Sequence, residues 1–102
     1  MSAKGIIAAG LDLGGTKIEA QVFGEGWALV ERRRIDTPSG YDALVAVLAD
    51  QIHWVTELDG ADLPVGVAAA GLINPATGLA LTANLWASGR PLPADLERAA
   101  GR

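Results

Sequence analysis

Apolar residues in the first third of the chain recur with the period of two that is typical of half-buried strands. Residues 5–13 form an apolar run, and residues 17–23 place Ile, Ala and Val at alternate positions. Residues 27–35 form a third such segment after a Gly-Glu-Gly turn. Because short turns join the three segments, the sequence predicts an antiparallel three-strand meander.

The apolar spacing then changes to that of a helix. Leu44, Leu48 and Ile52 recur on one face, which predicts a helix over residues 41–58. Residues 65–71 are apolar and small, so we expect a strand that is buried on both faces and ends at Gly71. The order strand, helix, strand places this strand parallel to an earlier one and predicts a mixed α/β sheet. A short strand at 79–82 and a helix starting near residue 94 complete the predicted elements.

Composition excludes several classes of function. The net charge of −4 argues against nucleic acid as a partner, because binding to phosphates needs a basic surface. The chain has no cysteine, which rules out disulfides and thiolate metal sites. No apolar run approaches the length of a membrane span, and none has the form of a signal peptide. We therefore expect a cytoplasmic protein that has neither a membrane nor a nucleic-acid partner.

The chemistry concentrates where the first strand meets the second, at Asp12-Leu-Gly14-Gly15-Thr16-Lys17. Two glycines suit a tight turn because they accept positive φ. Consecutive backbone N–H groups there can converge on an anion, with the Thr16 hydroxyl and the Lys17 ammonium as further donors. Asp12 can hold a hydrated Mg²⁺ beside that anion. The alternative is a plain hairpin whose Asp and Lys side chains are only solvated.

Two other segments contain candidate groups. Residues 83–93 bring together a carboxamide at Asn84, the indole of Trp86, a hydroxyl and a guanidinium, a set that suits a polyhydroxylated ligand. An ordered surface loop is the alternative for this segment. His53 is the only histidine, and we expect it to be structural or solvent-facing.

The chain resembles the ROK family (repressors, open reading frames and kinases) over essentially its whole length. The string 12–17 resembles the first phosphate motif of sugar kinases in the actin/hexokinase/Hsp70 superfamily. Gly66-x-x-x-Ala70-Gly71 stands where the family usually has Gly-x-x-x-Pro-Gly, and residues 82–85 match its Asn-Leu segment. The resemblance implies a ribonuclease H-like, actin-type ATPase lobe, namely the N-terminal lobe with the C-terminal lobe absent.

The resemblance also implies an activity and a set of site residues. The activity is transfer of phosphate from ATP to a hexose or N-acetylhexosamine, giving the sugar 6-phosphate, as in glucokinase, fructokinase or N-acetylglucosamine kinase. The residues at the ATP phosphates would be Asp12 (also at Mg²⁺), Gly14, Gly15, Thr16 and Lys17. Those at the sugar would be Gly71 and Asn84.

No catalytic residue is carried over from the family. Its catalytic base is the aspartate of an Asn-Asp pair, and this chain contains no Asn-Asp dipeptide. A structural zinc site, likewise, would belong only to the missing C-terminal part. We therefore expect the isolated chain to be inactive, and to self-associate through apolar surface that a second lobe would cover.

Two alternatives come from other functional classes. One is the core of a sugar-responsive ROK repressor, although the intact phosphate motif favours a kinase. The other is a stand-alone module that binds sugar or phosphate without catalysis.

Overall fold

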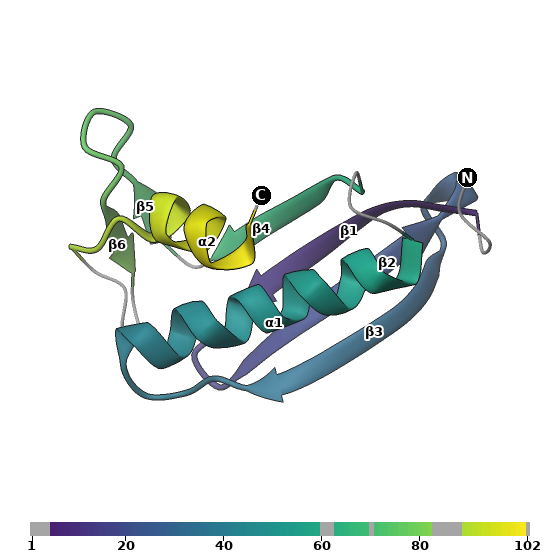
Figure 1. Ribbon diagram of the computed structural model, residues 1–102, viewed down its shortest axis with the longest axis horizontal. Coiled ribbons are helices and arrows are strands. Elements are labelled where there is room, and N and C mark those ends of the chain that lie inside the picture. Colours follow the sequence, from purple (N-terminus) through teal and green to yellow (C-terminus); the bar gives the residue numbers. More distant parts are fainter. Residues whose placement is uncertain (1–4, 60–62, 70, 83–88, 102) are drawn as a thin grey trace.

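The computed structural model describes residues 5–59, 63–69, 71–82 and 89–101, and these ranges form a sheet with two helices on one face (Figure 1). The sheet has the strand order β3-β2-β1-β4, and β5 pairs with β6 separately. The elements in chain order are β1 (Ile6–Leu13), β2 (Lys17–Gly24), the 3-10 turn η1 (Glu25–Trp27), β3 (Leu29–Asp36), α1 (Tyr41–Asp59), β4 (Val65–Ala69), β5 (Gly71–Ile73), β6 (Ala80–Thr82) and α2 (Leu92–Ala100).

The predicted meander is confirmed, because β1 pairs antiparallel with β2 and β2 with β3. The third strand begins later than the sequence suggested. Trp27 belongs to η1, where it has a positive φ of 63° and is 67% exposed. The sequence pattern did not separate this residue from the strand, because an aromatic residue is also a strand former.

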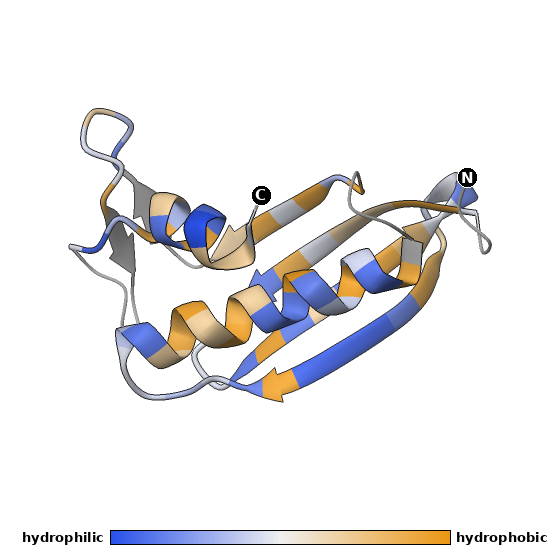
Figure 2. Cartoon of the chain, viewed as in Figure 1, coloured by the Kyte–Doolittle hydropathy of each residue, from blue (hydrophilic) through white to orange (hydrophobic). Residues whose placement is uncertain are grey.

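The helix α1 covers the sheet with the apolar face that its periodicity predicted. Leu44, Leu48 and Val55 are fully buried in one core cluster with the inward side chains of β1 and β2. The orange bands that recur along α1 in Figure 2 mark its hydrophobic residues. Burying an aliphatic side chain of this size contributes about 1.5–3 kcal/mol relative to exposure. This layer is the core of the described part of the chain.

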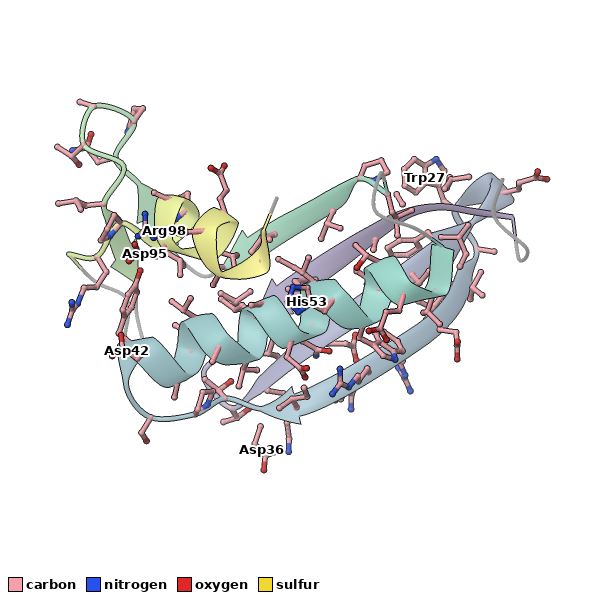
Figure 3. All side chains as sticks on the ribbon, in the orientation of Figure 1. Trp27, Asp36, Asp42, His53, Asp95 and Arg98 are labelled. Atoms are coloured by element: carbon pink, nitrogen blue, oxygen red, sulfur yellow. The ribbon has the colours of Figure 1, made fainter. Side chains whose placement is uncertain are left out.

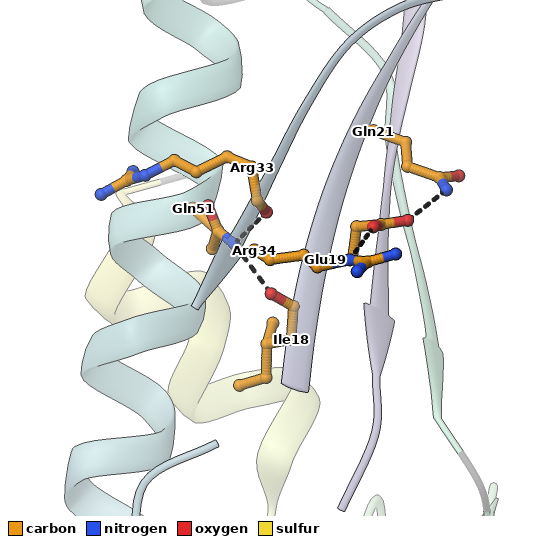
Figure 4. Close-up of polar contacts among 6 residues, drawn as sticks. All are labelled: Ile18, Glu19, Gln21, Arg33, Arg34 and Gln51. Atoms are coloured by element: carbon orange, nitrogen blue, oxygen red, sulfur yellow. Dashed lines mark hydrogen bonds and ion pairs between the residues drawn. The ribbon is translucent and has the colours of Figure 1, made fainter. Parts of the chain in front are cut away.

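A buried glutamine links the helix to the second and third strands of the meander. The side-chain N–H₂ of Gln51 donates to the carbonyl of Ile18 at 3.1 Å and to that of Arg33 at 2.9 Å (Figure 4). Gln51 is 0% exposed. Its two bonds fix the position of α1 along the sheet, because buried donors that lose their acceptors are costly.

The fourth strand is parallel to β1, as predicted, but it is not buried on both faces. Residues 66–69 are exposed, and Val67 is 44% exposed. Among the described residues β4 pairs with β1 alone and forms an edge of the sheet. An apolar run of small residues does not by itself distinguish an edge strand from a central one, which explains the wrong prediction.

The second helix packs on the first through both of its ends. Leu92, Leu96 and Ala100 are its buried residues. Near its start the hydroxyl of Tyr41 donates to Asp95 at 2.6 Å. At its end Nε2 of His53 lies 3.1 Å from the carbonyl of Ala100. Figure 3 labels Asp95 on α2 and His53 on α1. His53 is thus exposed and structural, as expected. Within the described ranges, no helix is both long and apolar enough to cross a membrane.

Candidate functional site

The end of β1 places one carboxylate on the face of the sheet opposite the helices. Leu11 and Leu13 are buried beneath α1, so the intervening Asp12 points the other way and is exposed. Its cross-strand neighbours are Glu19 on β2 and Ala68 on β4. Within the described ranges, Asp12 has no hydrogen-bond or ion-pair partner.

The neighbouring carboxylate is already neutralised. The Nε–H of Arg34 donates to Glu19 at 2.6 Å, and the amide of Gln21 donates to the other oxygen (Figure 4). These bonds, that of Arg34 first, lower the pKa of the Glu19 carboxyl below its ordinary value. Asp12 therefore remains as the carboxylate on this part of the face that can take a new partner.

The turn of the β1–β2 hairpin leaves no room for a side chain at Gly14. The N–H of Gly14 donates to the carbonyl of Lys17 at 2.9 Å, and a Cβ on Gly14 would lie 2.9 Å from that same oxygen. Gly14 does not have a positive φ, so the prediction that this turn needs left-handed glycine was wrong at this position. Glycine is required there because the carbonyl of Lys17 leaves no room for a side chain.

The hairpin tip presents donors to solvent. Gly15 and Thr16 are both exposed, and no described residue accepts a hydrogen bond from their N–H groups or from the Thr16 hydroxyl. Backbone N–H groups that converge without competing side chains form an anion-binding concavity. The predicted residues of the phosphate motif are therefore brought together at one end of the sheet.

The lysine of the motif is not free. The Nζ of Lys17 donates to Asp36, its register partner at the end of β3, and both side chains are exposed. This bond lowers the pKa of the Asp36 carboxyl below its ordinary value. Sequence reasoning missed Asp36, and the only signal was its place at the end of the third predicted strand.

The residues at this end fit Mg²⁺ that arrives with a nucleotide. No group of three or more His, Cys, Asp or Glu side chains gathers within the described ranges. Mg²⁺ needs no such group, since it keeps several waters and binds through one or two carboxylates plus substrate phosphates. Asp12, next to the hairpin tip, would supply that single carboxylate.

Of the two predicted sugar-side residues, one is described. Gly71 opens β5 instead of ending β4, two residues after Ala69, which is the register partner of Leu13. It therefore lies towards the same end of the sheet as the hairpin, because β1 and β4 are parallel. Asn84 lies outside the described residues.

Comparison with known proteins identifies the family of this chain. The profile of the ROK family matches residues 8–102. The chain belongs to the ROK family. It is 40% identical over 91 residues to an N-acetyl-D-glucosamine kinase of Pectobacterium atrosepticum, covering 87% of this chain and 30% of that protein.

Solved ROK structures share the fold as well. A ROK family glucokinase from Streptomyces griseus, in complex with glucose and AMPPNP, is 27% identical with a TM-score of 0.76, over 95% of this chain and 31% of that one. A ROK hexokinase from Thermus thermophilus is 30% identical with a TM-score of 0.72, over 93% of this chain and 32% of that one. The predicted mixed sheet of the actin-type ATPase fold is thus confirmed. The ROK chain spans about a third of these relatives.

Replacing Gly14 with alanine tests the steric closure of the hairpin. Gly14→Ala should lower the free energy of unfolding by about 1–3 kcal/mol, because the new Cβ forces a backbone shift. Gly66→Ala is the matched control, since a Cβ there meets no atom within 4 Å. Urea unfolding followed by tryptophan fluorescence measures both. Equal stability of the two variants would contradict the steric account.

Removing Asp36 tests whether its carboxylate competes with an anion for Lys17. Asp36→Asn should strengthen sulfate binding about two- to fivefold, the range that an exposed ion pair can contribute. Asp50→Asn frees Arg33 and changes the net charge by the same amount as Asp36→Asn, but it should change the sulfate affinity little. NMR titration measures the affinities.

The pH dependence of the same affinity has a defined sign. The pKa of Asp36 is lowered, so the pair with Lys17 persists at neutral pH and is lost as the pH falls through that lowered value. Wild type should approach the affinity of Asp36→Asn only in that acid range.

The comparison of the two variants also has a contrary outcome. If Asp50→Asn strengthened sulfate binding as much as Asp36→Asn, the gain would be a general effect of net charge.

Proposed function

We propose that this chain is the part of an ATP-dependent sugar kinase that binds the nucleotide phosphates and borders the sugar. The observation that carries the proposal is the combination, at one hairpin, of two exposed N–H groups with one carboxylate, Asp12, for which the described residues provide no partner. Catalysis of phosphoryl transfer consists mostly of positioning and charge stabilisation, and these are the groups that it needs.

Each residue of the motif has a distinct task in this proposal. The N–H groups of Gly15 and Thr16 and the Thr16 hydroxyl hold phosphate oxygens. Lys17 exchanges Asp36 for phosphate when the nucleotide arrives. Asp12 holds the hydrated Mg²⁺, which would supply positive charge next to the transferring phosphate. The Asn-Asp pair that supplies the general base for the sugar hydroxyl in the family does not occur in this sequence, so the chain alone should not turn over.

The sugar is a hexose or an N-acetylhexosamine. The curated relatives named N-acetyl-D-glucosamine kinase favour the amino sugar, and the Streptomyces griseus glucokinase, which was solved with glucose, supports a hexose. A fructokinase activity is the less supported member of this set. Gly71 and Asn84 would border the sugar, as in the predicted motif. The intact Asp12–Thr16 string favours a kinase over a repressor core.

Two further properties belong to the proposal. Self-association is supported by the exposed apolar residues along β4, above all Val67. Light scattering at micromolar concentration tests it, and a monodisperse monomer is the contrary result. A cytoplasmic location fits the use of ATP and the lack of cysteine, and cell fractionation tests it.

The activity is tested on two samples, the chain of 102 residues and the product of its whole reading frame. Both are incubated with Mg·ATP and either N-acetylglucosamine, glucose or fructose, and the sugar phosphate is followed by ³¹P NMR. We expect turnover only by the product of the whole frame, and a loss of at least a hundredfold on Asp12→Asn. Asp42→Asn, at an exposed position of α1, is the control.

Three results would contradict different parts of this proposal. Turnover by the 102-residue chain would show a catalytic base that the motif analysis missed. Failure of every sample to bind Mg·ATP in calorimetry would exclude the kinase and leave the sugar-binding module. Asp12→Asn with unchanged turnover would remove Asp12 from the metal site.

A further inference from the structure

Thr37, which follows β3 directly and lies outside the phosphate motif, is hydrogen-bonded to the β1–β2 hairpin. The hydroxyl of Thr37 donates to the carbonyl of Gly14 at 2.7 Å. The backbone N–H of Thr37 donates to the carbonyl of Thr16 at 2.9 Å. Thr37 lies 23 residues after Gly14 in the sequence. Both of its bonds reach the tip of the hairpin, residues 14–16, which carries the candidate anion site.

The bond to Gly14 determines where one of the anion donors points. The carbonyl of Gly14 and the N–H of Gly15 belong to the same planar trans peptide, in which the two groups point in opposite directions. Because the Thr37 hydroxyl holds the carbonyl on its own side, the N–H of Gly15 is directed away from Thr37. A freely rotating peptide at a glycine pair would also present its carbonyl outward, where it would repel an anion.

The second bond keeps another carbonyl away from the anion. The carbonyl of Thr16 accepts from the N–H of Thr37, one step beyond the last register pair of β2 with β3, Lys17 with Asp36. Both carbonyls of the tip that Thr37 contacts are therefore occupied within the fold, whereas the N–H groups of Gly15 and Thr16 keep no described partner. Thr37 thus withdraws two of the tip's carbonyls from the side on which an anion would bind.

The local sequence explains why Thr37 can reach both groups. Pro38 follows it, and a residue before proline is restricted to extended backbone. Thr37 therefore continues the direction of β3 for one residue, so its N–H faces β2. Its side chain is partly buried beside Gly14.

We propose that Thr37 is a positioning residue for the phosphate-binding hairpin, fixing the Gly14–Gly15 peptide so that the N–H of Gly15 faces the nucleotide phosphate. The inference rests on the proposed function, since it assigns Thr37 to the same site. Thr37 touches no substrate atom and acts through the peptide that it holds.

The test compares three variants. Thr37→Val removes the hydroxyl and keeps the shape and the backbone N–H, and Thr37→Ser restores the hydroxyl. Thr56→Val is the control, because the Thr56 hydroxyl also donates to a backbone carbonyl, that of His53, far along α1. Calorimetry with Mg·ATP gives the affinities, and thermal unfolding gives the stability of each variant.

We expect Thr37→Val to bind Mg·ATP about five- to tenfold more weakly, as loss of one oriented hydrogen bond to a charged ligand predicts. Thr37→Ser should bind within twofold of wild type, and so should Thr56→Val. A merely structural role would lower the melting temperature of Thr37→Val and Thr56→Val alike without this difference in affinity. Wild-type affinity in Thr37→Val, or no recovery in Thr37→Ser, overturns the proposal.

A readout without nucleotide separates this inference from the proposed function. In ligand-free ¹H–¹⁵N spectra, Thr37→Val should shift the Gly15 amide, whose peptide loses the hydrogen bond to its carbonyl side, while the amides of Leu11 and Val22 stay unchanged. An unaltered Gly15 amide in a chain that binds Mg·ATP overturns the role of Thr37 alone. A wild-type chain that does not bind Mg·ATP overturns the proposed function, and the anion role of Thr37 with it.

Discussion

The burial of Leu11 and Leu13 beneath α1 decides the chemistry at the end of β1. Side chains alternate along a strand, so burying these two leucines puts Asp12 on the opposite, open face. The same two leucines set the register in which Leu13 ends the strand and Gly14 begins the turn. Moving the strand by one residue would bury the carboxylate and expose the core. The position of the candidate metal ligand is thus a consequence of hydrophobic packing.

The hairpin that follows combines three constraints from different parts of the chain. Gly14 is required because the carbonyl of Lys17 occupies the space of a side chain. At the end of β3, Thr37 donates hydrogen bonds to two carbonyls of the tip. Asp36 pairs there with the ammonium of Lys17. Among the described residues, the N–H groups of Gly15 and Thr16, the Thr16 hydroxyl and the Asp12 carboxylate keep no partner. An anion that arrives with a divalent cation would match both kinds of group, because the anion accepts from the N–H groups and the cation binds the carboxylate. This match is the physical basis of the kinase proposal.

Much of this could be predicted from the sequence, where the signal is local. The alternation in β2 and the helical spacing in α1 each lie within one element, and the Asp-x-Gly-Gly-Thr-Lys string is six consecutive residues across the turn between β1 and β2. Each led to the observed strand, helix or hairpin. The exposure of β4 could not be predicted, because an apolar run does not say whether a strand has one neighbour or two. Thr37 and Asp36 were missed because they reach the hairpin only through the pairing of β2 with β3, a contact distant in the sequence.

The most direct test of the account is an NMR titration of the 102-residue chain with Mg·AMPPNP. If the hairpin binds nucleotide phosphate, the amides of Gly15 and Thr16 should shift most, and the shifts should saturate. Amides of the buried face of α1, such as that of Leu48, should stay in place. Saturating shifts that cluster on α2 or β4 while the hairpin amides remain unchanged would contradict the central claim.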